Sequence, residues 1–315
     1  MVQCKLHKKK LPVGNHLPRA FHHHRGDNPH MKPFLYLGDD HVGGAAAYLT
    51  GVLTHFGLPL QHVASGSPPQ EPFNPADYAT LIVSDYSSSG WLPGQMQQVA
   101  DAVAGGIGLL MIGGWESFHG RKPDGEYNAT PFAELLPVTL ADTDDRLNFP
   151  QPCLIRRMAD PGSDIDTLVK HPITDGLPWE SCVPGIGGLN RFTAKPGSQT
   201  LLETVPFTVR RVAVLGTGTT DEQNTHDEWN FTPEPAIPLL VVGNYGRGRV
   251  AALACDVAPH WVGGFVDWGT RRIAQPLSAA AFPELNDDGF IEVGADYAVF
   301  LRNLARWTAG DDGPF

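Results

Sequence analysis

The sequence is poor in the residues that mark a disulfide-linked or membrane-embedded protein. Its 315 residues include only four cysteines, at positions 4, 153, 182 and 255, and no two of them form a CxxC pair. This spacing argues against a disulfide framework and a structural zinc site, and it favours a reducing cytoplasm. No run reaches the roughly 18 to 20 consecutive apolar residues of a transmembrane helix, so no membrane partner is expected.

Positive charge is scarce outside the N-terminus. Residues 1–30 hold six Lys and Arg and one acid, Asp27, whereas the other 285 residues hold 17 basic and 33 acidic residues. An acidic body repels phosphate backbones, so nucleic acid is not an expected partner.

The first thirty residues differ from the rest of the chain. They hold six of the 13 histidines, including His22, His23 and His24, and no apolar segment of a secretory signal follows their lysines. They are interpreted either as a disordered, basic, His-rich extension or as a start assigned too early, with Met31 as the true start. A histidine triplet in such a segment is usually incidental.

From Met31 onward, short apolar strands alternate with helical segments. This pattern predicts the α/β class, with a doubly wound, mostly parallel sheet of the flavodoxin-like type. We expect one domain over residues 31–310 and a tail over 311–315. The expected strands are 34–37, 80–85 and 108–114, and the expected helices are 45–56, 93–104 and 294–308.

The stretch from about 138 to 250 is richer in proline and glycine. It predicts strand-and-loop elaborations of the same sheet, with short strands at 152–155, 200–203 and 209–215. Residues 237–243 and 249–255 form an expected hairpin across the turn 244–248. In the last helix, an apolar stripe at helical spacing predicts core packing; it contains Tyr297, Phe300, Leu301, Leu304 and Trp307.

Ligands of doubly wound sheets bind beyond the carboxyl ends of the strands. Three segments are expected there: 38–41, 113–120 and 255–269. The chain resembles the class I glutamine amidotransferase-like superfamily. The resemblance is carried by the order of strands, the Gly113-Gly114 turn and the segment from Cys255 to Trp261. The likeness covers residues 31–310 and is nearest to the "putative glutamine amidotransferase" branch, with ThuA-like proteins of trehalose utilisation as cousins. It implies an amidotransferase-like fold and, through these cousins, a carbohydrate ligand.

The chain departs from the active amidotransferases at the nucleophile. Those enzymes carry a cysteine in a sharp Gly-x-Cys-x-Gly turn, whereas the matching turn here is Gly113-Gly114-Trp115-Glu116-Ser117. The His-Pro-Glu partner is also replaced, by a region with Asp256 and His260. Glutamine hydrolysis by the family mechanism is therefore not expected, and Cys255 is interpreted as a buried thiol.

The remaining residue types at these strand ends suggest a different chemistry. Two carboxylates that face each other are the minimum for glycoside hydrolysis, and indole rings stack on sugars. The catalytic candidates are Glu116, Asp267, Asp256, His260 and His119. The candidates for substrate binding are Asp39, Asp40, Trp115, Ser117, Trp261 and Trp268.

Each candidate has a structural alternative. Asp39 and Asp40 could cap a helix, and Glu116 could pair with Arg121. The tryptophans could pack in the core or an interface, and either histidine could be structural. Ser117 lies beyond the tight turn and ranks below the carboxylates. Asp39, Asp40, His41 and His260 lack a diagnostic ligand spacing, so no metal or other cofactor is expected.

Two functions remain open. The favoured one is a hydrolase with a carboxylate-based site, a glycosidase acting on a small sugar. The alternative is a catalytically silent amidotransferase-like module that binds a ligand or acts as a scaffold. The long loops between 140 and 235 also predict a homo-oligomer, in which Trp229 covers the site of its own subunit or of a neighbour.

Overall fold

The computed structural model describes residues 31–160, 168–215, 225–283, 285, 287–311 and 313. The expected extension over residues 1–30 and most of the tail over 311–315 lie outside these described residues.

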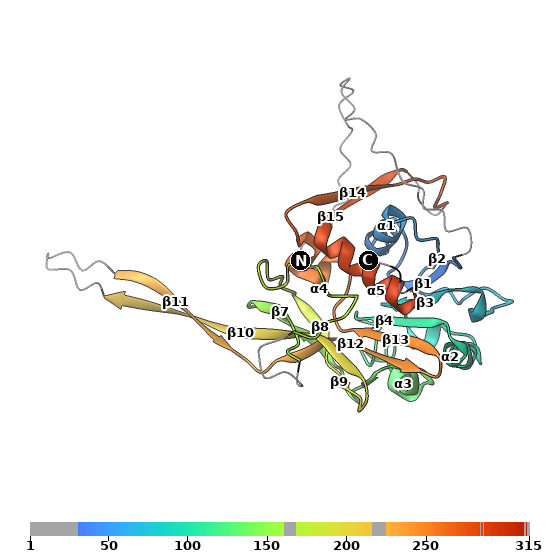
Figure 1. Cartoon of the computed structure of the whole chain (residues 1–315), viewed down its shortest axis with the longest axis horizontal. Coiled ribbons are helices and arrows are strands. Elements are labelled where there is room, and N and C mark those ends of the chain that lie inside the picture. Colours follow the sequence, from blue (N-terminus) through green and yellow to red (C-terminus); the bar gives the residue numbers. More distant parts are fainter. Residues whose placement is uncertain are drawn as a thin grey trace, which may run out of the picture.

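A nine-stranded sheet forms the centre of the protein (Figure 1). Its strands are β1 (Phe34–Gly38), β2 (Leu60–Val63), β3 (Thr80–Ser84), β4 (Gly108–Ile112), β7 (Cys153–Arg157), β10 (Gln199–Leu215), β11 (Thr225–Pro233), β12 (Ile237–Tyr245) and β13 (Gly248–Leu253). Their order is β11-β10-β12-β13-β4-β3-β1-β2, and β7 also pairs with β10. The five strands from β13 to β2 are parallel, whereas β12, β10, β11 and β7 extend the sheet in antiparallel fashion.

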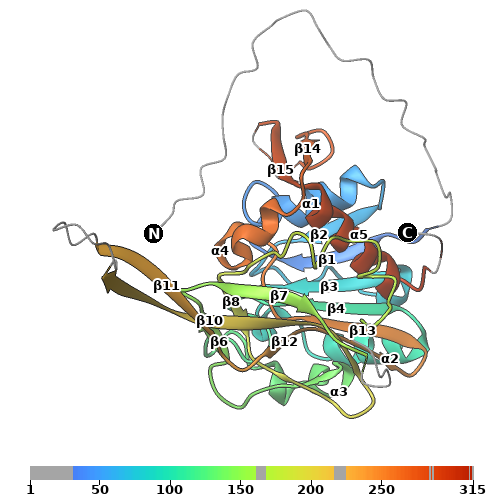
Figure 2. The ribbon, with the colours of Figure 1, turned by 60° about the vertical axis from the view of Figure 1, so that its left-hand side comes forward.

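Helices cover both faces of this sheet. α1 (Ala47–His55) and α5 (Ala295–Thr308) lie on one face, and α2 (Gln95–Gly105) and α3 (Phe132–Leu135) lie on the other (Figure 2). The doubly wound α/β arrangement is thereby confirmed. The apolar stripe of α5 is buried as expected, from Tyr297 to Trp307.

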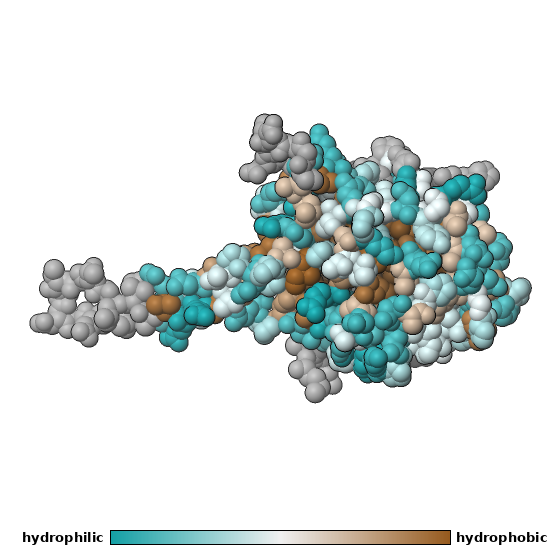
Figure 3. All heavy atoms as spheres, turned by 90° about the horizontal axis from the view of Figure 1, so that it is seen from below, coloured by the Kyte–Doolittle hydropathy of each residue, from teal (hydrophilic) through white to brown (hydrophobic). Residues whose placement is uncertain are grey.

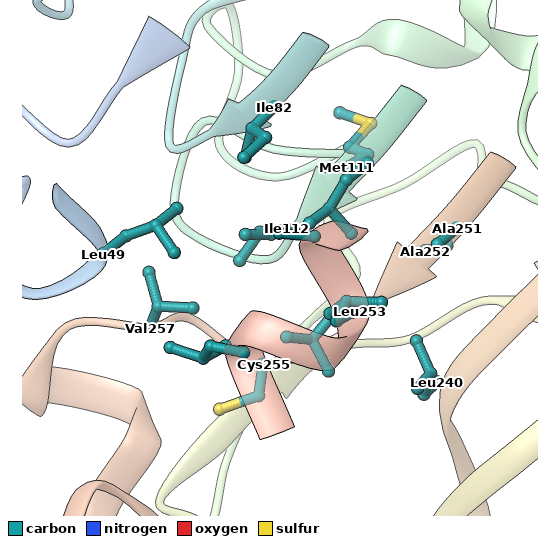
Figure 4. Close-up of a cluster of buried hydrophobic side chains, with 14 of the residues drawn as sticks. Leu49, Ile82, Met111, Ile112, Leu240, Ala251, Ala252, Leu253, Cys255 and Val257 are labelled. Carbon is teal, nitrogen blue, oxygen red and sulfur yellow. The ribbon is translucent and has the colours of Figure 1, made fainter. Parts of the chain in front are cut away.

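The parallel strands are apolar throughout because both of their faces are covered. Every residue of β1, β3 and β4 is buried, which explains why these strands lack an alternating pattern. Figure 4 shows Ile82, Met111 and Leu253 from three of the strands in one cluster with Leu49 of α1. Strands of this kind place their carboxyl ends along one edge of a rigid sheet.

Smaller elements surround the sheet. Three two-stranded ribbons pair β14 (Arg272–Leu277) with β15 (Gly289–Gly294), β5 (Val138–Thr139) with β9 (Thr193–Ala194), and β6 (Arg146–Asn148) with β8 (Gly188–Asn190). The short helical elements are α4 (Pro259–Val262), η1 (Pro75–Asp77), η2 (Ser88–Gly90), η3 (Tyr127–Ala129) and η4 (Gly263–Asp267). No helix in the described part of the chain is long and apolar enough to cross a membrane.

The antiparallel region is more continuous than its sequence predicts. The expected strands at 200–203 and 209–215 are one strand, β10, whose pairing with β12 is irregular between Thr200 and Glu203. The hairpin of β12 and β13 is confirmed.

Candidate functional site

Three aspartates lie at the carboxyl ends of three strands of the parallel sheet. Asp39 follows β1, Asp85 follows β3, and Asp256 comes shortly after β13. The backbone of Asp39 and Asp85 has positive φ angles of 54° and 44°, a conformation that aspartate tolerates better than most residues. Asp39 and Asp256 are both buried. Three carboxyl groups from distant parts of the sequence thus influence one another at one edge of the sheet.

Burial governs the protonation of this cluster. It raises the pKa of Asp39 well above the ordinary range, and the charges of Asp256 and Asp85 raise it further. The hydroxyl of Tyr36 donates a hydrogen bond to the Asp39 carboxyl, which acts in the opposite direction.

Asp256 is the member of the cluster whose protonation changes near neutrality. Burial raises its pKa to about 7, and the charge of Asp85 adds to this, although Oδ1 accepts a hydrogen bond from the backbone N–H of Ala258 at 2.8 Å. A carboxyl group of this pKa can both give and take a proton at neutral pH.

The turn after β4 packs directly on Asp85. Oδ1 of Asp85 accepts a hydrogen bond from the backbone N–H of Glu116 at 2.6 Å, and the N–H of Gly114 donates to Oδ1 of Asn190 at 2.9 Å. A Cβ atom at Gly114 would lie 2.7 Å from Oδ1 of Asp85, and one at Gly113 would lie 2.0 Å from the carbonyl oxygen of Ala254. Only glycine fits at these two positions.

Glu116 lies at the more open side of the cluster. Burial raises its pKa, and the charges of Asp85 and Asp124 add to the effect. The guanidinium of Arg121 lies 3.3 Å from Oε1 of Glu116 and 2.9 Å from Oδ2 of Asp124. The pairing with Arg121 expected as a structural alternative is therefore present, on a side chain that remains 26% exposed.

Trp115 presents an open aromatic surface beside Glu116. It is 40% exposed, and the guanidinium carbon of Arg146 lies 4.9 Å from the centre of its ring. The imidazole of the exposed His260, on α4, lies 5.9 Å from the same indole, measured between ring centroids. An aromatic face, a cation and an imidazole thus lie next to the acidic cluster.

The other two tryptophans do not lie on this surface, which corrects the expectation that they stack on a ligand. Trp261 and Trp268 are 1% and 3% exposed. Trp261 Nε1 donates to Oδ1 of Asn148 at 2.9 Å, and the ring of Trp268 packs against Trp179 with centroids 4.2 Å apart. Both stabilise the core.

Three further candidates are also placed outside the open part of the site. Ser117 is fully buried, and its hydroxyl accepts the backbone N–H of Asp85 at 3.0 Å. His119 is buried, with no hydrogen-bond partner for its ring nitrogens among the described residues. Asp267 pairs with Arg272 of the β14–β15 ribbon. Burial therefore corrects the expected direct contact of Ser117 and His119 with a ligand. The ion pair with Arg272 gives Asp267 a structural alternative to its expected catalytic role.

The two aspartates after β1 have separate environments. No side chain caps the N-terminus of α1, so the expected alternative of helix capping does not hold for Asp39 or Asp40. Asp40 is exposed, and its backbone N–H donates to the hydroxyl of Ser65 at 3.1 Å. Asp40 is therefore open to solvent at the rim of the site, whereas the Asp39 side chain is buried.

Three contributors to the site are not among the residues predicted from the sequence: Asp85, Tyr36 and Arg146. Asp85 has a signal in the sequence, because it comes at the end of its strand just as Asp39 does, but the strand pattern alone does not mark it as a site residue. Arg146 lies in a region that appeared irregular. Among the residues that the structure describes, no group of three or more His, Cys, Asp or Glu is arranged to hold a metal ion.

The comparisons with known proteins agree with this architecture. The sequence model of a family described as "Putative glutamine amidotransferase" matches residues 76–224 and 206–273, which together make up more than half of the chain. The chain belongs to this glutamine amidotransferase-like family. The superfamily resemblance predicted from the Gly113-Gly114 turn and the segment after β13 is thus confirmed.

Two solved structures cover most of the chain. Cytoplasmic Protein STM1381 from Salmonella typhimurium LT2 is 26% identical, with a TM-score of 0.59 over 88% of this chain and 99% of that one. Cytoplasmic Protein STM3548 from Salmonella typhimurium is 21% identical, with a TM-score of 0.58 over 88% of this chain and 98% of that one, and it shows the fold alone. No curated protein matches the chain significantly.

Proposed function

We propose that this amidotransferase-like protein is a hydrolase that uses carboxyl groups, rather than a cysteine, to cleave a small sugar substrate. The observation that carries the proposal is the burial of Asp256, which raises its pKa to about 7 beside two further carboxyl groups at the carboxyl edge of the sheet. Perturbed carboxyl groups of this kind cluster at catalytic sites.

Asp256 and Glu116 take different roles in this proposal. Below about pH 7 Asp256 carries a proton and can donate it to the oxygen of a leaving group. Glu116 lies closer to solvent and beside the positive charge of Arg121, which favours its ionised form. It would act as the carboxylate that assists water or attacks the sugar. The charge of Asp85 raises the pKa of both Asp256 and Glu116.

The rim supplies groups that suit a sugar. The open face of Trp115 can stack on the C–H face of a pyranose ring, while Arg146, His260 and Asp40 can bond hydroxyl groups. The substrate would therefore be a small sugar. By analogy with Cytoplasmic Protein STM1381, we also propose a cytoplasmic location.

The proposal is tested by steady-state kinetics on a panel of chromogenic glycosides, with esters and glutamine as controls. Asp256→Asn and Glu116→Gln should each lower kcat at least 100-fold, because general acid–base catalysis contributes about that much. Asp267→Asn is the matched control, since Asp267 pairs with Arg272 on a surface ribbon and should leave turnover unchanged.

The pH profile provides an independent readout. A general acid with a pKa of about 7 predicts that kcat/KM falls as the pH rises through 7 and that Asp256→Asn abolishes this limb. Turnover that survives Asp256→Asn with an unchanged pH profile would refute the assignment.

A second candidate function is a silent ligand-binding module. It is favoured by the turn after β4, where the N–H of Glu116 is bonded to Asp85 and Ser117 is buried. If no substrate is turned over, titration with sugars should still quench the fluorescence of Trp115, and Trp115→Ala should remove the effect.

A further inference from the structure

The strands β10 and β11 form a long ribbon that extends from the body of the protein (Figures 1 and 2). β10 pairs with β12 from Gln199 to Thr204 and with β7 from Leu202 to Pro206. From Phe207 outward it pairs with β11 alone in the described part of the chain. Two-stranded ribbons without a third layer are marginal in water unless something covers one face.

One face of this ribbon is mainly apolar. Directly opposed residues of an antiparallel pair point to the same side, and alternate residues share that side. The register opposes Phe207 to Pro233, Val209 to Phe231 and Arg211 to Trp229. Trp229 and Phe231 are 58% and 57% exposed, which is unusual for aromatic side chains on a monomer.

The opposite face is mainly polar. It carries Thr208, Arg210, Val212, Glu228, Asn230 and Thr232. An ion pair supports the assignment of the two faces, because Arg211 Nη2 lies 2.6 Å from Oδ2 of Asp227, and Asp227 opposes Ala213 on the Trp229 side. The ribbon is therefore amphipathic.

The apolar face continues into a groove at the base of the ribbon. Phe207 and Pro233 belong to the face and also line a mainly apolar groove of about 430 Å³. The rest of its apolar lining is Leu154, Ile155, Leu168, Trp179, Val183 and Val205, and Arg156, Arg157 and Glu180 are its charged residues. Figure 3 shows hydrophobic surface where the ribbon joins the body. The groove is large enough to receive an aromatic side chain.

We propose that a second copy of this chain covers this surface, with Trp229 and Phe231 of each ribbon seated in the basal groove of the other copy. A protruding apolar element and a groove on one continuous face are what a two-fold, isologous contact requires, because each copy supplies both halves. The charges on the two surfaces are compatible with this contact. The ribbon face carries one residue of each sign, Arg211 and Asp227. The groove also carries both signs, in Glu180, Arg156 and Arg157. This inference is independent of the proposed hydrolase activity.

The exposure of Trp229 also argues against one of its two expected positions, the one over the site of its own subunit. A side chain that is 58% exposed on a protruding ribbon does not cover the site of its own subunit. Its place on the partner is the basal groove, on the antiparallel side of the sheet.

The experiment is light scattering coupled to size-exclusion chromatography on the full chain at micromolar concentration. The wild-type protein should elute with the mass of two chains, and Trp229→Ser combined with Phe231→Ser should elute with the mass of one. Val212→Ser is the matched control, because Val212 is 40% exposed on the opposite face of the same ribbon. It should leave the dimer intact.

A variant in the groove distinguishes a dimer in which each ribbon binds the partner's groove from a dimer in which the two ribbons contact each other. Val183→Asp places a charge in the groove and should also give monomers. An equimolar mixture of Val183→Asp with the ribbon double variant should regain mixed dimers, since one intact ribbon and one intact groove remain in each pair. Circular dichroism and the thermal midpoint should show that every variant is folded. A monomeric wild-type protein, a control variant that dissociates, or a mixture that stays monomeric would each overturn the proposal.

Discussion

Oδ1 of Asp85 accepts a hydrogen bond from the backbone N–H of Glu116 at 2.6 Å. In a nucleophile turn, the N–H of the residue after the nucleophile stabilises the oxyanion. With the turn matched to Gly-x-Cys-x-Gly, Trp115 stands at the cysteine position and Glu116 comes directly after it. The donor that an amidotransferase would use is thus already bound to a side chain of the protein.

Restoring the cysteine alone should therefore not restore the family reaction. We expect Trp115→Cys to hydrolyse glutamine no faster than the wild-type protein, because the N–H of Glu116 remains engaged by Asp85. Ammonia release from glutamine provides the measurement. Since Trp115 is 40% exposed, the variant should fold normally, and clear glutaminase activity in it would contradict the assignment of this turn.

The close packing of the turn predicts a large difference between two glycine variants. Gly114→Ala should lower the free energy of unfolding by roughly 1 to 3 kcal/mol, because its Cβ would lie 2.7 Å from a carboxylate oxygen. Gly105→Ala, at the end of α2, meets nothing within 4 Å and should stabilise by about 0.5 kcal/mol. Urea unfolding compares the two, and equal effects would show that the turn has room to relax.

The burial of Asp256 predicts a pH-dependent gain of stability on its replacement. Its pKa rises from 3.8 to about 7 on folding, so the folded state binds more protons than the unfolded state between these values. Stability is therefore lost as the pH rises from about 4 to 7. Asp256→Asn keeps the shape of the side chain without the charge, and its stabilising effect should be roughly 2 to 3 kcal/mol larger at pH 7.5 than at pH 5. Chemical unfolding at both values measures this, and a gain that does not vary with pH would refute it.

The burial of His171 predicts the opposite dependence of stability on pH. Burial lowers its pKa from 6.5 to about 4, so the unfolded state binds the additional proton as the pH falls below 6.5. The corresponding loss of stability amounts to roughly 2 kcal/mol between pH 7.5 and pH 5. His171→Asn retains an acceptor for the N–H of Ile173 but cannot ionise, so its unfolding free energy should fall less over this range. An acid sensitivity equal to that of the wild-type protein would contradict this prediction.

The sequence predicts the centre of the fold well and its periphery poorly. β1, β3 and β4 are continuous apolar segments because both faces of the sheet are covered, and α5 carries a regular stripe. β2, β11, β14 and β15 were not predicted, because partly exposed strands lack such a pattern. Their positions depend on partners that are distant in the sequence.

For the candidate site, the sequence indicates the ends of the strands but not how deeply each side chain lies. Strand ends can be located from the sequence, so Asp39, Asp256 and Glu116 were found. The depth of a side chain below the surface cannot be read in this way. Trp261, Trp268, Ser117 and His119 are close in sequence to open residues such as Trp115 and His260, yet they point into the interior.

β10 pairs with β12 and β7 through residues 199–206, on the antiparallel side of the sheet, whereas the three aspartates follow strands of the parallel half. The outer part of the ribbon, from Phe207 to Leu215 of β10, pairs with β11 and with none of the parallel strands. Under the two proposals made above, assembly and chemistry reside in separate parts of the sheet. A relative that keeps the three aspartates but has a shorter ribbon would then retain the proposed reaction and exist as single chains.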